Sequence, residues 1–360
     1  MVHAMADGKI SGAGQFSKKC ANLLNNLYGY EHTLLTTSCS DALEMCAMLI
    51  DIGPGDEIIM PSYTFVSTAN AFIRQGAKVI FADSTPKHPN IDPDSIANAI
   101  TAKTKAVVVI HYGGIEPNMD KIIKLCKQHN IVLIEDAAQS IHSQKNNQWL
   151  GKKSDLAVMS FHDSKNITCG EGGLLIINNQ VYKEKAEILW EKGTNRYNFT
   201  LGKVHKYEWL DIGSSFLMAD LNAAYLYAQL ENADTITANR KKLWHNYAQQ
   251  IQSNEFMTSC HDTITSENDH NAHIFYLDIH SALFKEKLLQ VFKKENIYAL
   301  SHYLALHNSP YYLSKNDKMS LPNAERFEHS ILRLPLYMDL TISDQERVIN
   351  CVNNCIRTMH

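Results

Sequence analysis

Two neighbouring stretches, IVLIEDAAQS (Ile131–Ser140) and DLAVMSFHDSKNITCGEGGLLIINN (Asp155–Asn179), decide the fold class of this 360-residue chain. Their apolar runs show no polar alternation, which is typical of strands covered on both faces. The second stretch holds two such runs with only a loop, 163–171, between them. One of these two strands is therefore expected to run antiparallel to its neighbour.

Four earlier runs of the same kind alternate with helical patterns. The runs are His32–Ser38, Glu57–Ser62, Lys78–Asp83 and Ala106–Tyr112, and the helical patterns are Asp41–Ile50, Ser67–Gln75 and Met119–His129. Strand–helix–strand alternation predicts an α/β fold: a mainly parallel sheet of about seven strands with helices on both faces.

The second half of the chain has a different pattern. It predicts one or two long helices, a strand and two further helices, at Asp220–Gln252, His273–His280, Ser281–Glu295 and Ser343–Met359. These elements indicate a smaller C-terminal α+β domain. The boundary is expected inside the long helical stretch, giving a large domain at residues 1–235 and a small one at 236–360.

Composition excludes several classes of function. The formal net charge is -4 and the pI is about 6.5, so no basic field exists to bind nucleic acid. No apolar run has membrane length and the N-terminus lacks a signal-peptide core, so we expect a cytoplasmic protein without a membrane partner. No C-x-x-C pair occurs, which argues against a zinc ribbon. We interpret His270, His273 and His280 as scattered polar positions around a strand rather than as ligands of a metal ion.

Polar residues collect where the predicted strands end, the edge at which ligands bind to open α/β sheets. Asp136 and Gln139 follow one strand, and burying an unpaired carboxylate there would cost several kcal/mol. Lys165 follows the next strand and precedes a glycine-rich turn at 170–173. Read singly, Asp136 could be a helix N-cap and Lys165 a solvated surface lysine.

Ser38, Cys39 and Ser40 follow the first strand, at the start of a predicted helix. The free N–H groups of a helix N-terminus suit a phosphate, although an ordinary N-cap would leave the same pattern. Phosphate site, lysine and acid together are what pyridoxal phosphate needs. The lysine amine binds the cofactor's aldehyde covalently and moves protons, and the acid keeps the pyridine nitrogen protonated.

The motifs together resemble the DegT/DnrJ/EryC1/StrS family of sugar aminotransferases from about Lys9 to the C-terminus. They are TTSCSDAL, GDEIIMPSYTFVSTANAF, VIHYGG, IEDAAQS, SFHDSKNITCGEGG, EKGTNR and DIGSSFLMADLNAA. The resemblance implies the type I fold of pyridoxal-phosphate transferases, which is like that of aspartate aminotransferase.

The resemblance also implies roles for individual residues. Lys165 would hold the cofactor covalently and Asp136 would pair with its pyridine nitrogen, while Gln139 would lie near the ring's phenolic oxygen. The remaining cofactor contacts would be Phe65 stacked on the ring, Ser38, Cys39, Ser40 and Ser160 at the phosphate, and His162 in the same pocket. Ser215 stands where many members have an asparagine that reaches the neighbouring subunit's phosphate. Arg196 and His307 are candidate substrate contacts, with surface or packing roles equally expected.

TTSC and SFH-x-x-KN-x-T are similar to the branch that aminates C4 of a dTDP-linked 4-keto-6-deoxy sugar, with L-glutamate as donor, in lipopolysaccharide O-antigen synthesis. Homodimers or larger homo-oligomers are implied. Two alternatives stay open: amination with gluco stereochemistry or at C3, and a non-catalytic regulator with the same fold. A sugar dehydratase is disfavoured, because family members with that activity have histidine in place of Lys165. Relatives usually have a segment before Ser11–Gly14, so we expect a shallower site or a weaker dimer here.

Overall fold

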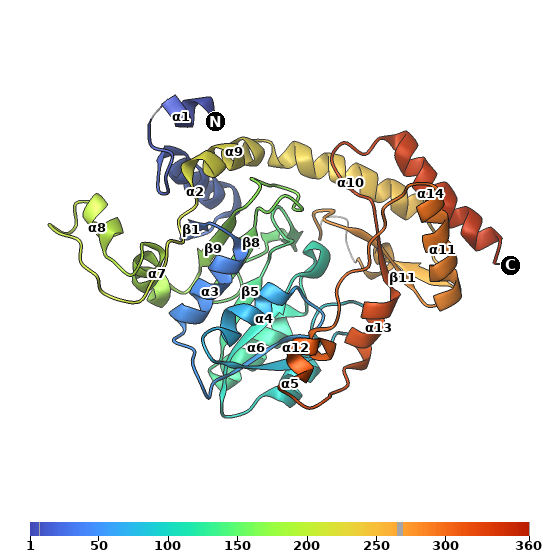
Figure 1. Cartoon of the computed structure of the whole chain (residues 1–360), viewed down its shortest axis with the longest axis horizontal. Coiled ribbons are helices and arrows are strands. Elements are labelled where there is room, and N and C mark those ends of the chain that lie inside the picture. Colours follow the sequence, from blue (N-terminus) through green and yellow to red (C-terminus); the bar gives the residue numbers. More distant parts are fainter. Residues whose placement is uncertain (7, 265–268, 360) are drawn as a thin grey trace.

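The computed structural model describes residues 1–6, 8–264 and 269–359. A large α/β body carries the N-terminal part of the chain, and a smaller unit carries the C-terminal part (Figure 1). The long helix α10 (Ala233–Gln250) runs from the large body to the small one, where it packs against α14 (Ile342–Arg357).

A seven-stranded sheet forms the centre of the large body, in the order β1-β9-β8-β5-β4-β2-β3. Its strands are β1 (Thr33–Thr36), β2 (Glu57–Pro61), β3 (Lys78–Ala82), β4 (Thr104–Ile110), β5 (Val132–Asp136), β8 (Leu156–Ser160) and β9 (Gly173–Ile177). From β3 to β8 all neighbours are parallel, and β9 runs antiparallel to both β8 and β1. The predicted fold class and the antiparallel return are confirmed.

Helices cover both faces of this sheet. One face carries α3 (Cys39–Leu49), α4 (Val66–Ile73) and α7 (Lys183–Trp190). The other carries α2 (Gln15–Tyr28), α5 (Pro93–Ala99), α6 (Met119–His129) and α9 (Asp220–Glu231). Because every residue of β5, β8 and β9 except Val132 is buried, their Val, Leu and Ile side chains pack in both directions.

The small unit is a three-stranded antiparallel sheet, β10-β11-β12, with helices beside it. Its elements are β10 (Met257–Ser259), β11 (Phe275–Ile279), β12 (Ile331–Leu334), α11 (Ala282–Lys294), α12 (Pro310–Leu313), α13 (Pro322–Ser330) and α14. The predicted helical stretch 220–252 is two helices, α9 and α10, which meet at Asn232. The expected domain boundary falls in the first turn of α10 and remains a prediction.

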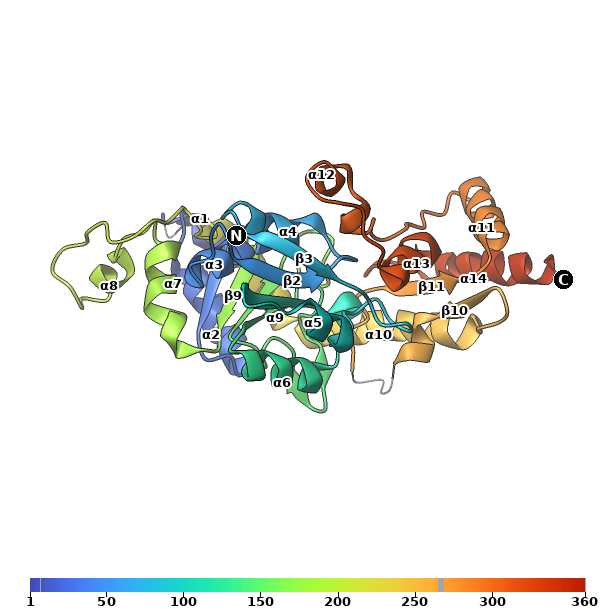
Figure 2. The ribbon, with the colours of Figure 1, turned by 90° about the horizontal axis from the view of Figure 1, so that it is seen from below.

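A segment at residues 194–215 extends from the large body as an arm, with the short helix α8 (Arg196–Thr200) at its outer part (Figures 1 and 2). It exposes several large apolar side chains. They are Phe199, Leu201, Tyr207, Trp209, Leu210 and Ile212. The remaining elements are short: α1 (Val2–Ala6), β6 (Gln144–Lys145), β7 (Gln148–Trp149) and the 3-10 helices Tyr112–Gly114, Gln180–Tyr182, Cys260–Thr263 and Leu306–Asn308.

Candidate active site

A cavity of about 420 Å³ opens where β5 and β8 end and where α3 and α4 begin. This is the edge at which parallel sheets bind ligands. Most of the residues predicted to bind the cofactor line it. They are Ser38, Cys39, Ser40, Phe65, Asp136, Gln139, Ser160, His162 and Lys165.

The two acids that end β5 lie in different environments. Glu135 is fully buried, and its carboxylate accepts hydrogen bonds from His111 Nε2 at 2.8 Å and from Ser154 Oγ at 2.8 Å, besides backbone N–H groups. Burial alone would raise the pKa of Glu135, but His111 and Ser154 outweigh it and the pKa is lowered. Glu135 is therefore a satisfied structural acid, while Asp136 lines the cavity.

Asp136 lacks a comparable set of partners. Its Oδ2 accepts from Thr68 Oγ1 on α4 at 2.8 Å, and its Oδ1 accepts from the Ala138 N–H at 3.2 Å. Burial raises the pKa of Asp136, although these hydrogen bonds and the charge of Lys165 oppose the increase. Asp136 has no positively charged hydrogen-bond donor among these partners, and a cationic N–H group bound in the cavity would be one.

Lys165 is held by a compact turn between β8 and β9. The backbone N–H of Lys165 donates to His162 O at 2.9 Å, and the turn closes through Gly170, which has φ of 82°. Burial lowers the pKa of Lys165, while Cys39 and Asp136 act in the opposite direction. The lysine amine therefore loses its proton more readily than an exposed lysine, as a nucleophile and general base requires.

The N-terminus of α3 forms the polar end of the cavity. Ser38 caps the helix by accepting from the Asp41 N–H at 3.1 Å, and Ser40 Oγ donates to Ser67 Oγ at 2.8 Å. Gly173 opens this corner, because a Cβ there would collide with the backbone of Ser38 and Cys39. Backbone N–H groups and hydroxyls at a helix start are the usual ligands of a phosphate.

One wall of the cavity is formed jointly by residues of the large body and of the small unit. Gln139 accepts from the Gly113 N–H at 2.7 Å and donates from Nε2 to the Tyr303 hydroxyl at 2.9 Å. Phe65, 57% exposed, faces Tyr303 with ring centroids 6.3 Å apart. An exposed apolar ring on a cavity wall is suited to stacking against a planar ligand.

Three predicted contacts lie outside the cavity lining. Ser215 is exposed at the base of the arm, and Arg196 lies on α8 with about half of its side chain exposed. His307 is fully buried, with Nδ1 2.7 Å from Ser62 Oγ and Nε2 3.2 Å from Glu325. In this chain His307 packs the small unit against the large one, which is the packing role left open above.

Other residues also line the cavity, and the sequence did not predict them as cofactor or substrate contacts. They include Thr64, Ser67 and Thr68 from the start of α4 and its preceding loop, and His273, His302, Tyr303 and Arg333 from the small unit. Thr68 lies within the TFVSTANAF motif, but its contact with Asp136 depends on how α4 packs against β5. For the small-unit residues, neither spacing nor periodicity gave a signal.

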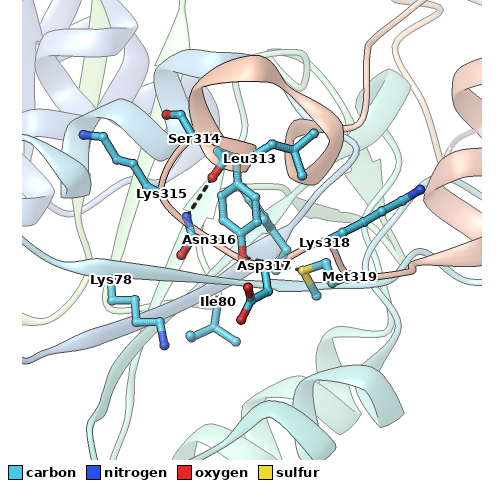
Figure 3. A pocket seen from close by; sticks show the side chains of 11 residues that line it. Lys78, Ile80, Leu313, Ser314, Lys315, Asn316, Asp317, Lys318 and Met319 are labelled. Carbon is cyan, nitrogen blue, oxygen red and sulfur yellow. Dashed lines mark hydrogen bonds between the residues drawn. The ribbon is translucent and has the colours of Figure 1, made fainter.

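A second cavity, of about 650 Å³, shares no residue with the first. Figure 3 shows it between β3 at the sheet edge and the end of α12 with the segment that follows, lined by Lys78, Ile80, Phe81 and residues 312–319. Lys315 and Lys318 point away from it. The Tyr312 hydroxyl donates a hydrogen bond to Met319 Sδ at 3.6 Å. It holds no acid–lysine pair at a strand end, so we do not assign the chemistry to it.

Within the described ranges 1–6, 8–264 and 269–359, no group of three or more His, Cys, Asp or Glu side chains could hold a metal ion. No described helix combines the length and apolar character needed to cross a bilayer.

Known proteins resemble the chain over nearly its whole length. The uncharacterized protein MJ1066 of Methanocaldococcus jannaschii is 30% identical over 351 residues, covering 95% of this chain and 90% of that protein. The aminotransferase TlmJ of Streptoalloteichus hindustanus superposes with a TM-score of 0.91 at 26% identity, over 100% and 95% of the two chains. NtdA of Bacillus subtilis, solved with bound cofactor PMP, gives a TM-score of 0.89 at 25% identity, over 99% and 80%.

The family pattern described as "DegT/DnrJ/EryC1/StrS aminotransferase family" matches residues 1–353. That match spans both the large body and the small unit, and so includes every residue of the cavity. The chain belongs to the DegT/DnrJ/EryC1/StrS aminotransferase family, and it is accordingly a sugar aminotransferase dependent on pyridoxal phosphate.

Proposed function

We propose that this chain is a dTDP-4-amino-4,6-dideoxygalactose transaminase acting in the cytoplasm in lipopolysaccharide O-antigen synthesis. L-Glutamate would donate the amino group and leave as 2-oxoglutarate. The amino group would pass to C4 of dTDP-4-dehydro-6-deoxy-D-glucose and give dTDP-4-amino-4,6-dideoxy-D-galactose. The observation that carries the proposal is the meeting of Asp136, Lys165 and the α3 N-terminus in one cavity.

The residues present fit pyridoxal phosphate. The raised pKa of Asp136 follows from burial without a cation bonded to it, and a protonated pyridine nitrogen would supply one. The start of α3, with Ser40 and Ser160, suits the phosphate, and Lys165 suits the aldehyde. When bound, the cofactor supplies an electron sink for the carbon whose C–H bond breaks.

The chain's own groups would then position the substrates and move the proton. Phe65 would hold the cofactor ring by stacking, and Gln139, anchored by Gly113, would direct its second amide N–H toward the phenolic oxygen. Lys165 Nζ would take the proton from Cα of glutamate and return a proton to C4 of the sugar. Its lowered pKa, caused by burial, favours the neutral base that the first step requires.

We also propose that the protein is a homodimer or a larger homo-oligomer. The arm at 194–215 exposes Trp209 at 81% and Ile212 at 73%, beside other apolar side chains. Apolar side chains gathered in this way on a projecting segment are typical of a protein–protein interface. Ser215 and Arg196 belong to the same arm, so an arm docked on a second copy could bring them to that copy's cavity.

One assay tests the reaction. The purified protein is incubated with L-glutamate and dTDP-4-dehydro-6-deoxy-D-glucose, and NMR of the product must show an axial amine at C4. An equatorial amine, or amination at C3, would replace the proposed product by another sugar amine. A colourless protein that makes no amino sugar would favour a non-catalytic regulator.

The lysine gives a matched pair of variants. Lys165→Ala should lose both the cofactor's visible absorbance and measurable turnover, because Lys165 is the only lysine among the described residues that line the cavity. Lys121→Ala, on the exposed side of α6, should retain both. Full activity of Lys165→Ala would remove the basis of the proposal.

A further inference from the structure

His273 lines the active-site cavity directly before the last residues that lead into β11, and its backbone is fixed on both sides. Its N–H donates to Asn271 Oδ1 at 3.1 Å, and its carbonyl accepts from Arg240 Nη2 at 2.7 Å. Asn271 is itself held, because its Nδ2 donates to the carbonyls of Gln139 and Ile141 at 2.9 and 2.8 Å. The imidazole of His273 therefore starts from a defined position at the cavity wall.

Asn166, the residue after Lys165, determines which ring nitrogen of His273 carries the proton. Asn166 Nδ2 donates to the Asn271 carbonyl at 2.8 Å, so Asn166 Oδ1 is the acceptor end of this amide. That oxygen lies 2.9 Å from His273 Nδ1, which must therefore be the protonated nitrogen. Nε2 is left with a lone pair, and no described residue donates a hydrogen bond to it.

His273 stays uncharged in this position. Burial holds the pKa of His273 well below its usual range, and the positive charge of Lys165 acts in the same direction. Only 5% of His273 is exposed, so water cannot offset the cost of charging it. At neutral pH Nε2 is therefore a hydrogen-bond acceptor, and a ligand group that faces it must supply an O–H or an N–H.

The other histidines that line the cavity are differently placed. His302 uses both ring nitrogens within the protein, with Nδ1 3.2 Å from the Tyr112 hydroxyl and Nε2 2.9 Å from Arg333 Nη1. His162 has 45% of its side chain exposed and faces two carboxylates. Serine and threonine hydroxyls of the cavity can donate as well as accept, so they do not select a donor. Among the described cavity residues, the buried and uncommitted ring nitrogen is that of His273.

The two proposed substrates differ in what they present beside the reacting carbon. In L-glutamate that carbon carries, besides the amino group that is transferred, a carboxylate and a methylene group, and neither donates a hydrogen bond. In the keto-sugar, C4 lies between C3, which carries a hydroxyl, and C5, which carries a methyl group. Because Asn166 joins His273 to the turn that holds Lys165, Nε2 belongs to the part of the cavity where the reacting carbon must lie. The C3 hydroxyl is the group that complements it.

The same hydrogen bond would decide which face of the sugar is aminated. Half a turn of the sugar about the line through C1 and C4 exchanges the C3 hydroxyl with the C5 methyl group. It also presents the opposite face of C4 to the cofactor. In that orientation a methyl group would face Nε2, and the hydroxyl would lose its buried acceptor. An acceptor on one wall therefore favours one orientation of the sugar and one configuration of the product amine.

We propose that His273 accepts a hydrogen bond from the C3 hydroxyl of the keto-sugar and so directs the amino group to one face of C4, with Asn166 as its positioning residue. The inference rests on the proposed function, because it assigns a sugar group to the same cavity. It makes His273 a specificity-determining residue for the sugar half-reaction and leaves the glutamate half-reaction to other groups.

Two variants separate the acceptor from the packing. His273→Asn keeps an N–H for Asn166 Oδ1 but has no acceptor at the position of Nε2, whereas His273→Gln can place its amide oxygen there. In enzyme loaded with pyridoxamine phosphate, kcat/KM for the keto-sugar should fall by about 10- to 100-fold in His273→Asn and recover in part in His273→Gln. The rate with L-glutamate should stay within about threefold in both variants. His280→Asn changes an exposed histidine directly after β11 and should alter neither rate.

A keto-sugar without the C3 hydroxyl gives a readout that a structural role would not affect. The unmodified protein should react with this 3-deoxy analogue about 10- to 100-fold more slowly than with the 3-hydroxy sugar, and His273→Asn should hardly distinguish the two. NMR should show amines of both configurations in the variant's product. Should His273→Asn not fold, the unmodified protein still decides, because equal rates with the two sugars overturn the assignment.

Two further outcomes count against the assignment or against its basis. An equal loss in both half-reactions of His273→Asn would overturn it, because Nε2 would then serve a group common to both, such as the Lys165 amine. An unmodified protein that aminates neither keto-sugar would instead overturn the proposed function.

Discussion

Replacing Asp136 by asparagine removes a charge from the site without changing its shape. The Asn oxygen could still accept from the Ala138 N–H, and the amide nitrogen could donate to Thr68 Oγ1, which has free lone pairs. Both contacts survive, so the variant should fold. What disappears is the carboxylate that would keep the cofactor's ring nitrogen protonated.

The magnitude follows from burial. Removing one partner of a buried ion pair costs about 3–5 kcal/mol. Asp136 is only 5% exposed, so solvent would recover little of this energy. If the loss falls on the transition state, the first half-reaction should slow by roughly 100- to 5,000-fold. Stopped-flow absorbance at saturating L-glutamate measures this rate, and a variant retaining more than about a tenth of it would refute the role of Asp136.

In the cofactor-free protein, Asp136→Asn should stabilise the fold, although it slows the reaction of the loaded enzyme. Burial raises the folded-state pKa of Asp136, so its contribution to stability is complete below the unfolded pKa of about 3.9 and is lost as the pH rises through the folded pKa. Asparagine has no such loss. Cofactor-free Asp136→Asn should therefore melt at a higher temperature than the unmodified protein at pH 8, with the gap closing toward pH 4. A lower Tm at pH 8 would contradict the argument.

Three further predictions concern the cofactor's surroundings and the arm. Gly173→Ala should weaken cofactor binding in a spectral titration, because the new Cβ collides with Ser38 and Cys39 at the start of α3. Phe65→Ala should weaken the same affinity by about 2- to 12-fold, the equivalent of 0.5–1.5 kcal/mol of ring stacking. Trp209→Asp should shift the sedimentation coefficient toward the monomer, whereas Tyr298→Asp, equally exposed on the small unit, should not. Unchanged affinity or assembly would count against the corresponding contact.

Patterning was enough to predict the large body. Its strands are apolar on both faces, so the runs stand out without knowledge of neighbours. The four strands predicted at 32–38, 57–62, 78–83 and 106–112 each lie within two residues of those bounds. The loop between β8 and β9 is too short for a crossover, so the antiparallel pairing also followed from the sequence. For Asp220–Gln252 the sequence left one or two helices open, and the chain has two.

The sequence could not assign roles to neighbouring residues of the same type. Two adjacent acids end β5. Only the packing of the sheet places Glu135 within hydrogen-bond distance of His111 and Ser154, while Asp136 lines the cavity. Two histidines lie in HYLALH, and the turn at Leu306–Asn308 buries His307 beneath Ser62, whereas His302 reaches the cavity. Resemblance suggested His307 as a substrate contact; the geometry makes His302 the cavity residue.

What the sequence determined by itself was local: which segments are strands, which helix begins at Ser38, and that a lysine and an acid follow two buried strands. Parallel strands end at a common edge, so those residues had to meet. Tertiary structure decided the wall opposite them, because His302, Tyr303 and Arg333 come from a unit whose position depends on how α10 joins it to the sheet. Contacts between elements far apart in the chain depend on packing shape, which leaves no period or spacing in the sequence.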